Sequence, residues 1–385
     1  MVDAAAHGSF SDEDIAELAS HLADSGTRLA RDDSAADIAS TGGVGSLSTL
    51  LCPIYLRQRG FRIPKIGVTG RPAGGVDVLQ TIRGYNAHLD PGNSRDVLSH
   101  TGYFHLEAGE QWAPLDSKLF RYRQTTGAQS LAPLVIASIL AKKLAAGVVN
   151  AGLDVRTAPY GNFGHNWSAA RENAHRYIRV ATLLGLRPMC ALTDASQPSQ
   201  PYIGRGEALV GLWRALHGND TLWLDNHVSA CRAISDAMNK PPGNGRTQAD
   251  VSPVEVMVSL LETHETSWLE FEEAVGRVLN SPRVVVRAQY DGVISYDLPA
   301  LRATLVSRQA LDTFRIGQPM PDPAGVTLLF PSRHHVHAGE AIMIIRAAPD
   351  EERLIAQLSS YAVVHANRQP DASHEGIQTL EIIRA

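Results

Sequence analysis

A glycine-rich stretch near the start of the chain carries residues that could bind an anion. It reads Ser40-Thr41-Gly42-Gly43-Val44-Gly45-Ser46 and is followed by Leu47-Ser48-Thr49. The glycines let the backbone turn tightly, and its amide groups can form a nest with the hydroxyls of Ser40, Thr41, Ser46 and Thr49 around it. Residues 47–55 predict a helix whose positive end faces that nest. Neither the P-loop nor the GxGxxG pattern is present, so a plain structural turn is the alternative interpretation.

A second glycine-rich stretch follows a short apolar run. Residues 65–68 predict a strand, and Thr69 at its end leads into Gly70-Arg71-Pro72-Ala73-Gly74-Gly75. Ligands of open α/β sheets lie beyond the carboxyl ends of the strands, so Thr69 is another candidate for binding the anion. A strand-to-helix turn without a ligand fits the pattern equally well.

A third stretch combines cationic and hydroxyl side chains. Arg123 precedes a predicted helix that begins near Pro133 and ends at Gly147. Ser138 and Lys142 are spaced i, i+4 on this helix, so their side chains project from the same face. With Arg123 they form a group of donors that suits a planar ligand rich in carbonyl oxygens. The competing interpretation of Lys142 is a solvated surface charge.

The elements that must position these residues alternate along the chain. Short apolar runs predict strands over 148–155 and 187–193, and helical patterns cover 168–184, 204–218 and 253–278. This alternation is typical of βαβ units around a mainly parallel sheet. From residue 283 onward, short strands separated by turns predict a smaller α+β portion.

We therefore expect an α/β fold with a small helical lobe and a large α/β lobe. The expected parts are a helical lobe (1–35 with 115–147), an α/β lobe (36–114 with 148–280) and a C-terminal α+β portion (281–385). The cluster Pro241-Pro242-Gly243-Asn244-Gly245 predicts a turn or linker between the last two parts.

Composition narrows the classes of function. The 385 residues carry a net charge of −5, which gives no general attraction to nucleic acid, and no apolar run approaches the length of a membrane span. Three separated cysteines fit reduced thiols, and the histidines near residue 335 lack partners at metal-ligand spacing. The N-terminal residues carry no secretory signal. We expect a cytoplasmic protein that binds a small molecule, with no metal, nucleic-acid or membrane partner.

Taken together, these stretches resemble the thymidine and pyrimidine-nucleoside phosphorylases. Residues 40–45 match the family's STGGVG phosphate loop, and Arg123 with residues 136–145 matches its pyrimidine-binding arginine and helix almost letter for letter. Residues 24–27, 192–194 and 337–341 resemble weaker family segments in the same order. The likeness extends over nearly the whole chain. Anthranilate phosphoribosyltransferases share the implied fold, but their acidic pair for metal and pyrophosphate is not apparent here.

The resemblance implies a fold of the nucleoside phosphorylase and phosphoribosyltransferase type and a pentosyltransferase activity. The implied reaction is phosphorolysis of a pyrimidine nucleoside to the free base and (deoxy)ribose 1-phosphate, with no cofactor beyond inorganic phosphate as co-substrate. Arg123, Ser138 and Lys142 would hold the base, and the two cations would stabilise charge on the leaving base. Phosphate would be bound by the glycine stretch and its neighbours, namely Ser40, Thr41, Gly42, Gly43, Thr49 and Thr69.

The chain departs from the family in the implied phosphate site. Ile38-Ala39 stand where the family has Lys-His, Ser46 stands for an aspartate, and Val76 for a phosphate-binding threonine. Loss of the lysine costs phosphate binding on the order of 1–4 kcal/mol. Arg156 is a candidate for the replacement cation. The alternatives are therefore transfer to water or another acceptor, on a pyrimidine nucleoside or nucleotide derivative, or a catalytically silent pyrimidine-binding protein.

The family is dimeric, so the resemblance also implies a homodimer. Most of the family's dimer-forming N-terminal helices have no counterpart in this sequence.

Overall fold

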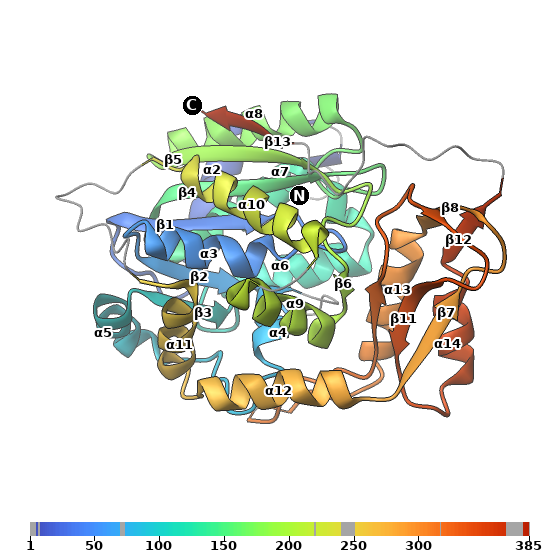
Figure 1. The fold of residues 1–385 in the computed structure, drawn as a ribbon. Helices are drawn as coiled ribbons and strands as arrows, with labels where there is room; N and C mark the ends of the chain where they lie inside the picture. The colour runs from blue at the N-terminus through green and yellow to red at the C-terminus, as the bar shows by residue number, and fades with distance from the viewer. Residues whose placement is uncertain are drawn as a thin grey trace.

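The computed structural model describes residues 5–6, 8–69, 74–218, 221–239, 251–315, 317–366 and 380–384. A four-stranded sheet in the order β1-β4-β5-β13 lies at its centre (Figure 1). Its strands are β1 (Asp32–Ser40), β4 (Val148–Thr157), β5 (Arg187–Asp194) and β13 (Leu380–Arg384). The first three are parallel to their neighbours, and β13 runs antiparallel to β5. The expected α/β class with a mainly parallel central sheet is confirmed.

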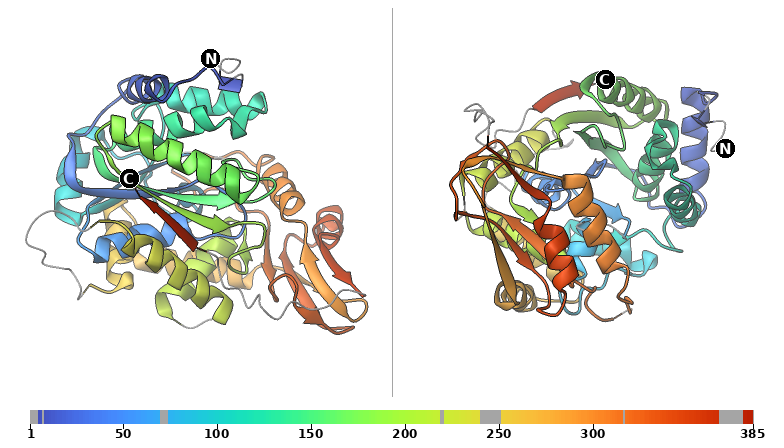
Figure 2. Two further views of the ribbon diagram at one scale, coloured as in Figure 1. Left: turned by 90° about the horizontal axis from the view of Figure 1, so that it is seen from above. Right: turned by 90° about the vertical axis from the view of Figure 1, so that its right-hand side faces the viewer.

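Helices cover both faces of this sheet (Figure 2). One face carries α2 (Asp12–Ala23), α7 (Ala132–Ala145) and α8 (Trp167–Leu183), which bury an apolar cluster against β4 and β5. The other face carries α3 (Ser48–Gln58), α9 (Arg205–His217) and α10 (Leu222–Asp236) over a second cluster. The predicted helical stretches 168–184 and 204–218 are therefore confirmed to within a residue at each end.

Local sequence signals explain where several helices begin. Ser11 accepts a hydrogen bond from the amide of Asp14, and Asp14 accepts one from the amide of Ser11, so the two residues form a capping box at the start of α2. Pro133 stands in the first turn of α7, where a missing amide hydrogen costs nothing.

A small sheet extends this centre on the β1 side. Parallel strands β2 (Ile63–Gly67) and β3 (Tyr103–Glu107) pair with each other, and a single parallel bridge joins Ala35, before the middle of β1, to Arg62. Three parallel strands, β1, β2 and β3, thus lie side by side (Figure 1). The remaining elements before α7 are α4 (Gly75–Leu79), α5 (Pro91–Thr101), α6 (Pro114–Thr125) and the 3-10 turn η1 (Ala128–Ser130). The sequence pattern over 90–116 assigns neither α5 nor β3.

The C-terminal portion contains two small sheets. One has the order β6-β9-β11-β7 and the other β10-β8-β12. The strands are β6 (Tyr202–Ile203), β7 (Arg283–Arg287), β8 (Gly292–Tyr296), β9 (Gly325–Leu328), β10 (His335–Val336), β11 (Ala341–Arg346) and β12 (Ala362–His365), and the helices are α13 (Leu298–Gln309) and α14 (Glu352–Ser359). The C-terminal α+β portion is confirmed, although β13 leaves it and joins the central sheet.

One predicted helix is wrong in its extent. The stretch 253–278 forms two helices, α11 (Pro253–Thr263) and α12 (Trp268–Asn280), because Glu265 adopts a left-handed backbone with φ 62° and Ser267 caps a new helix. The turn cluster predicted at 241–245 and residues 70–73 of the second glycine stretch lie outside the described residues.

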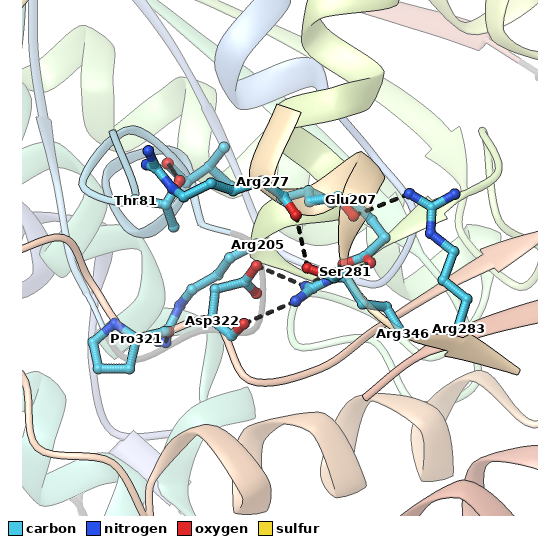
Figure 3. A network of polar contacts seen from close by, with 11 residues as sticks. Thr81, Arg205, Glu207, Arg277, Ser281, Arg283, Pro321, Asp322 and Arg346 are labelled. Carbon is cyan, nitrogen blue, oxygen red and sulfur yellow. Dashed lines mark hydrogen bonds and ion pairs between the residues drawn. The ribbon is translucent and has the colours of Figure 1, made fainter. Parts of the chain in front are cut away.

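Ion pairs fix the C-terminal portion to the α/β lobe (Figure 3). Arg346 of β11 donates two hydrogen bonds to Glu207 of α9, at 2.6 and 2.9 Å, and another to Asp322 at 2.6 Å. Arg205 of α9 donates to the Pro321 carbonyl at 2.6 Å. Burial by itself lowers the pKa of Arg346, but the two carboxylates raise that pKa above its ordinary value.

The described residues contain no helix with the length and apolar character that crossing a membrane requires.

Candidate functional site

A cavity of about 180 Å³ lies at the carboxyl ends of β1 and β2, between the glycine stretch and α7. Nearly all of the predicted site residues line it. From the glycine stretch and the start of α3 these are Ser40, Thr41, Gly42, Gly43 and Thr49, and from α6 and α7 they are Arg123, Ser138 and Lys142. The structure thus brings the two separately predicted groups to one cavity.

The glycine stretch holds a shape that requires glycine. Gly42, Gly43 and Gly45 have φ values of +93°, +131° and +69°, which other residues rarely adopt. The Thr41 hydroxyl accepts a hydrogen bond from the Arg156 amide at 2.9 Å, and the Thr41 amide donates to the Asp154 carbonyl at 3.0 Å. The stretch is therefore held on the end of β4 and presents its other side to the cavity.

Arg123 is buried and bonded to backbone oxygens. Its guanidinium donates to the carbonyls of Ala128, Gln129 and Leu134 at 3.2, 2.7 and 3.3 Å. Burial lowers the pKa of Arg123, against the attraction of the Asp116 carboxylate. In this arrangement Arg123 ties the segment between α6 and α7 in place, and three of its five N–H donors are used on these carbonyls.

Lys142 is not a solvated surface charge. Its ammonium donates to Asp116 Oδ2 at 2.6 Å, to the Ser138 carbonyl at 2.5 Å and to the Ser138 hydroxyl at 3.0 Å. Asp116 is fully buried, and within the described part of the chain its Oδ1 has no partner. The sequence predicts the Ser138–Lys142 pair from its spacing, but it gives no signal for Asp116, which lies 26 residues away.

A second buried cluster lies beneath the glycine stretch. Asp37 of β1 accepts from Lys65 of β2 at 2.6 Å and from Lys143 of α7 at 2.9 Å. Burial by itself raises the pKa of a carboxyl, but the two ammonium groups hold the pKa of Asp37 well below its ordinary value. Burial lowers the pKa of Lys143 to about 8, against the attraction of Asp37. Asp37 and Lys65 both line the cavity, and the sequence patterns singled out neither.

His105 of β3 completes this side of the cavity. It is 1% exposed, and its backbone amide donates to Nε2 of His264 at 2.9 Å. His264 in turn donates from Nδ1 to the Asn86 carbonyl at 2.7 Å and stacks on Tyr85. Burial, and after it the Lys65 ammonium, lowers the pKa of His105 well below its ordinary value, and burial lowers the pKa of His264 to about 4.

Other residues lie differently from the sequence-based expectation. Thr69 is not among the lining residues, because its hydroxyl donates to Glu107 at 2.6 Å. Arg156 is buried behind the glycine stretch, where it donates to the Ser199 hydroxyl at 3.0 Å, and it does not line the cavity. The Ile38 side chain packs in the apolar cluster under α3, away from the cavity. Arg302 of α13, which no sequence pattern singled out, does line it.

The charge of the lining is strongly one-sided. Four cationic side chains line the cavity, namely Lys65, Arg123, Lys142 and Arg302. Asp37 is the single carboxylate among the lining residues. The described residues form no group of three or more histidine, cysteine or acidic side chains that could hold a metal. The cavity therefore suits an anionic or carbonyl-rich organic ligand.

Comparison with known proteins places the chain near one family. It is 29% identical over 213 residues to a pyrimidine-nucleoside phosphorylase of Staphylococcus epidermidis and 32% identical over 217 residues to a thymidine phosphorylase of Sinorhizobium fredii. It is also 32% identical over 236 residues to the human thymidine phosphorylase. These matches cover 54–56% of this chain, and the chain spans about half (49%) of the length of these relatives.

No protein-family profile matches the chain. Among solved structures, an anthranilate phosphoribosyltransferase variant from Saccharomyces cerevisiae in complex with 4-fluoroanthranilate aligns with 12% identity and a TM-score of 0.42, over 69% of this chain and 80% of the other. A likeness of that size carries no argument about the ligand. The predicted resemblance to the thymidine and pyrimidine-nucleoside phosphorylases is confirmed at about 30% identity over half of the chain.

Proposed function

We propose that this chain, a divergent relative of the thymidine and pyrimidine-nucleoside phosphorylases, is a pentosyltransferase that cleaves the N-glycosidic bond of a pyrimidine nucleoside. The favoured reaction is phosphorolysis to the free base and a pentose 1-phosphate. The observation that carries the proposal is that the Arg123–Ser138–Lys142 group and the glycine stretch line the same cavity.

The base would bind at the α7 end of this cavity. Lys142 and Ser138 lie within 3.0 Å of each other there, and Arg123 lines the same end. A uracil-like ring has carbonyl oxygens that accept hydrogen bonds from such groups. Cleavage pushes the bonding electrons onto the base, so the negative charge grows on these oxygens toward the transition state. Two cations then stabilise the transition state more than the ground state.

Asp116 would act as a positioning residue. It accepts a hydrogen bond from the Lys142 ammonium at 2.6 Å, which fixes the position of this ammonium. A lysine with one orientation loses less conformational freedom when the base arrives, so more of the interaction contributes to binding.

The acceptor would bind at the glycine end, near the hydroxyls of Ser40 and Thr49. Phosphate oxygens there would attack the anomeric carbon, and the leaving base would take the electron pair of the broken C–N bond. Holding both reactants in one small cavity supplies much of the rate gain of such a reaction.

The test is base release from a panel of pyrimidine nucleosides and nucleotides, with and without inorganic phosphate, followed by chromatography. Phosphate-dependent release with formation of a sugar 1-phosphate is the expected result. Release without phosphate would identify water or another molecule as the acceptor. Binding of the base without any release would contradict an enzymatic role and indicate a pyrimidine-binding protein.

A further inference from the structure

The wall of the cavity formed by β1, β2 and β3 carries a charged group that the resemblance does not account for. Asp37, Lys65 and His105 stand on the adjacent parallel strands β1, β2 and β3. Lys65 and His105 are direct partners in the β2–β3 register, so their side chains lie next to each other on one face. All three residues line the cavity and are buried.

This wall carries more positive than negative charge. Lys65 and Lys143 share the one carboxylate of Asp37, so two ammonium groups against one carboxylate leave one positive charge in excess. A buried charge without a counterion is costly, which favours an anion in the adjacent space. The Lys65 ammonium spends two of its three hydrogens on Asp37 and on the Ile38 carbonyl at 2.8 Å. Nothing among the described residues accepts the third, and Lys65 faces the cavity.

His105 supplies an independent indication of a ligand. Its Nδ1 is buried without a hydrogen-bond partner in the described part of the chain, although the residue is 1% exposed. The ring stands close to Gly75, where a Cβ would overlap Cε1 and lie 3.0 Å from His105 Nε2 and 3.1 Å from Thr49 Oγ1. Glycine at this position therefore keeps the imidazole beside Thr49, a residue expected to bind the acceptor.

We propose that Lys65 and His105 form the anion end of the cavity and bind the acceptor, inorganic phosphate. Lys65 supplies a fixed cation from β2, and the neutral imidazole of His105 supplies a hydrogen-bonding group between Lys65 and Thr49. Arg156 does not have this role, because it lies behind the glycine stretch. The assignment rests on the proposed function, of which it specifies the nucleophile site.

The experiment titrates inorganic phosphate into the full-length chain by isothermal calorimetry. Lys65→Met keeps the length of the side chain and removes its charge, and we expect the Kd for phosphate to rise at least tenfold. Lys65→Arg restores a cation and is expected to recover part of the affinity. Lys118→Met, on the exposed face of α6, is the matched control and is expected to leave the Kd unchanged. His105→Leu is expected to weaken phosphate binding by a smaller factor.

Binding of uracil or thymine by the same variants checks the fold, because the base end lies on α7. Native-like base binding with weakened phosphate binding supports the assignment. Native-like phosphate binding by the Lys65→Met variant overturns the assignment. Loss of phosphate binding in the Arg302→Met variant alone overturns it as well.

The proposed function and this assignment can fail separately. Base release that needs no phosphate, from a chain that does not bind phosphate, overturns the anion site and leaves glycosyl transfer standing. Phosphate binding that depends on Lys65, in a chain that neither binds nor releases a base, overturns the function and leaves the anion site standing.

Discussion

Replacing Asp37 by asparagine should destabilise the whole chain, because this carboxylate is the shared counterion of two buried ammonium groups. Asp37 is 6% exposed, and it accepts from Lys65 and Lys143 at 2.6 and 2.9 Å. Asparagine has nearly the same shape but carries no charge. The side-chain amide of asparagine has one acceptor oxygen and one donor NH2 group. In either orientation the NH2 group therefore faces the ammonium of Lys65 or of Lys143, which is also a donor.

The size of the effect follows from these two contacts. Hydrogen bonds to charged groups contribute about 1.5–3 kcal/mol each, and removing one partner of a buried ion pair costs about 3–5 kcal/mol. We therefore expect Asp37→Asn to lower the free energy of unfolding by about 3–5 kcal/mol. The pKa of Asp37 is lowered in the folded chain, so its stabilisation is full above the ordinary pKa of 3.8 and is lost as the pH falls below it.

The assay is equilibrium unfolding in urea at pH 7, followed by both tryptophan fluorescence and circular dichroism. Asp33→Asn is the control, since Asp33 lies on the same strand and forms an exposed pair with Arg187 at 3.1 Å. Exposed pairs contribute about 0–1 kcal/mol. Adding Lys143→Met to Asp37→Asn should recover part of the loss. A loss no larger than that of the control would show that the two ammonium groups do not depend on this carboxylate, which would refute the reasoning.

Three further outcomes are expected. Lys142→Ala should abolish binding of uracil or thymine in calorimetry, and unchanged affinity would remove the base-site assignment. Protonation of His264 in the unfolded chain at its ordinary pKa of 6.5, against about 4 in the folded chain, should lower the free energy of unfolding by about 3 kcal/mol between pH 6.5 and pH 4, in addition to the fall that buried His105 causes; His264→Gln should remove this part of the slope, and an unchanged slope would exclude His264 as a source. Ile38→Lys, which restores the family's lysine, should lower stability by about 3 kcal/mol or more and leave phosphate affinity unimproved, because Ile38 packs in the apolar core; tighter phosphate binding would contradict that placement.

Features with a local cause could be predicted from the sequence. The capping box of Ser11 and Asp14 depends on residues three apart, and the pairing of Ser138 with Lys142 depends on the pitch of one helix. The glycine stretch was likewise predicted from its own composition, and the strands and helices around it follow from apolar periodicity. The base end of the candidate site could therefore be proposed before the fold was known.

The wall formed by β1, β2 and β3 could not be predicted in this way. Asp37, Lys65 and His105 come from three strands separated by 28 and 40 positions in the sequence, and only the pairing of β1, β2 and β3 brings them together. Such pairing is decided by packing across the whole domain, which leaves no spacing signal in the residues themselves. Asp116 and Arg302 escaped prediction for the same reason.

The packing around Glu207 restricts how this chain can drift in sequence (Figure 3). A side chain on Gly325 would overlap the Glu207 carboxylate, and one on Gly206 would overlap Asp322. Arg346 donates hydrogen bonds to the carboxylates of Glu207 and Asp322. Each carboxylate fits only because the glycine beside it has no side chain. A change at one of these positions is tolerated only once another has already changed, so the positions are inherited as a block. A lineage that loses Arg346 should therefore be free to replace the neighbouring glycines afterwards. Aligned relatives should have either all of these residues or none of them.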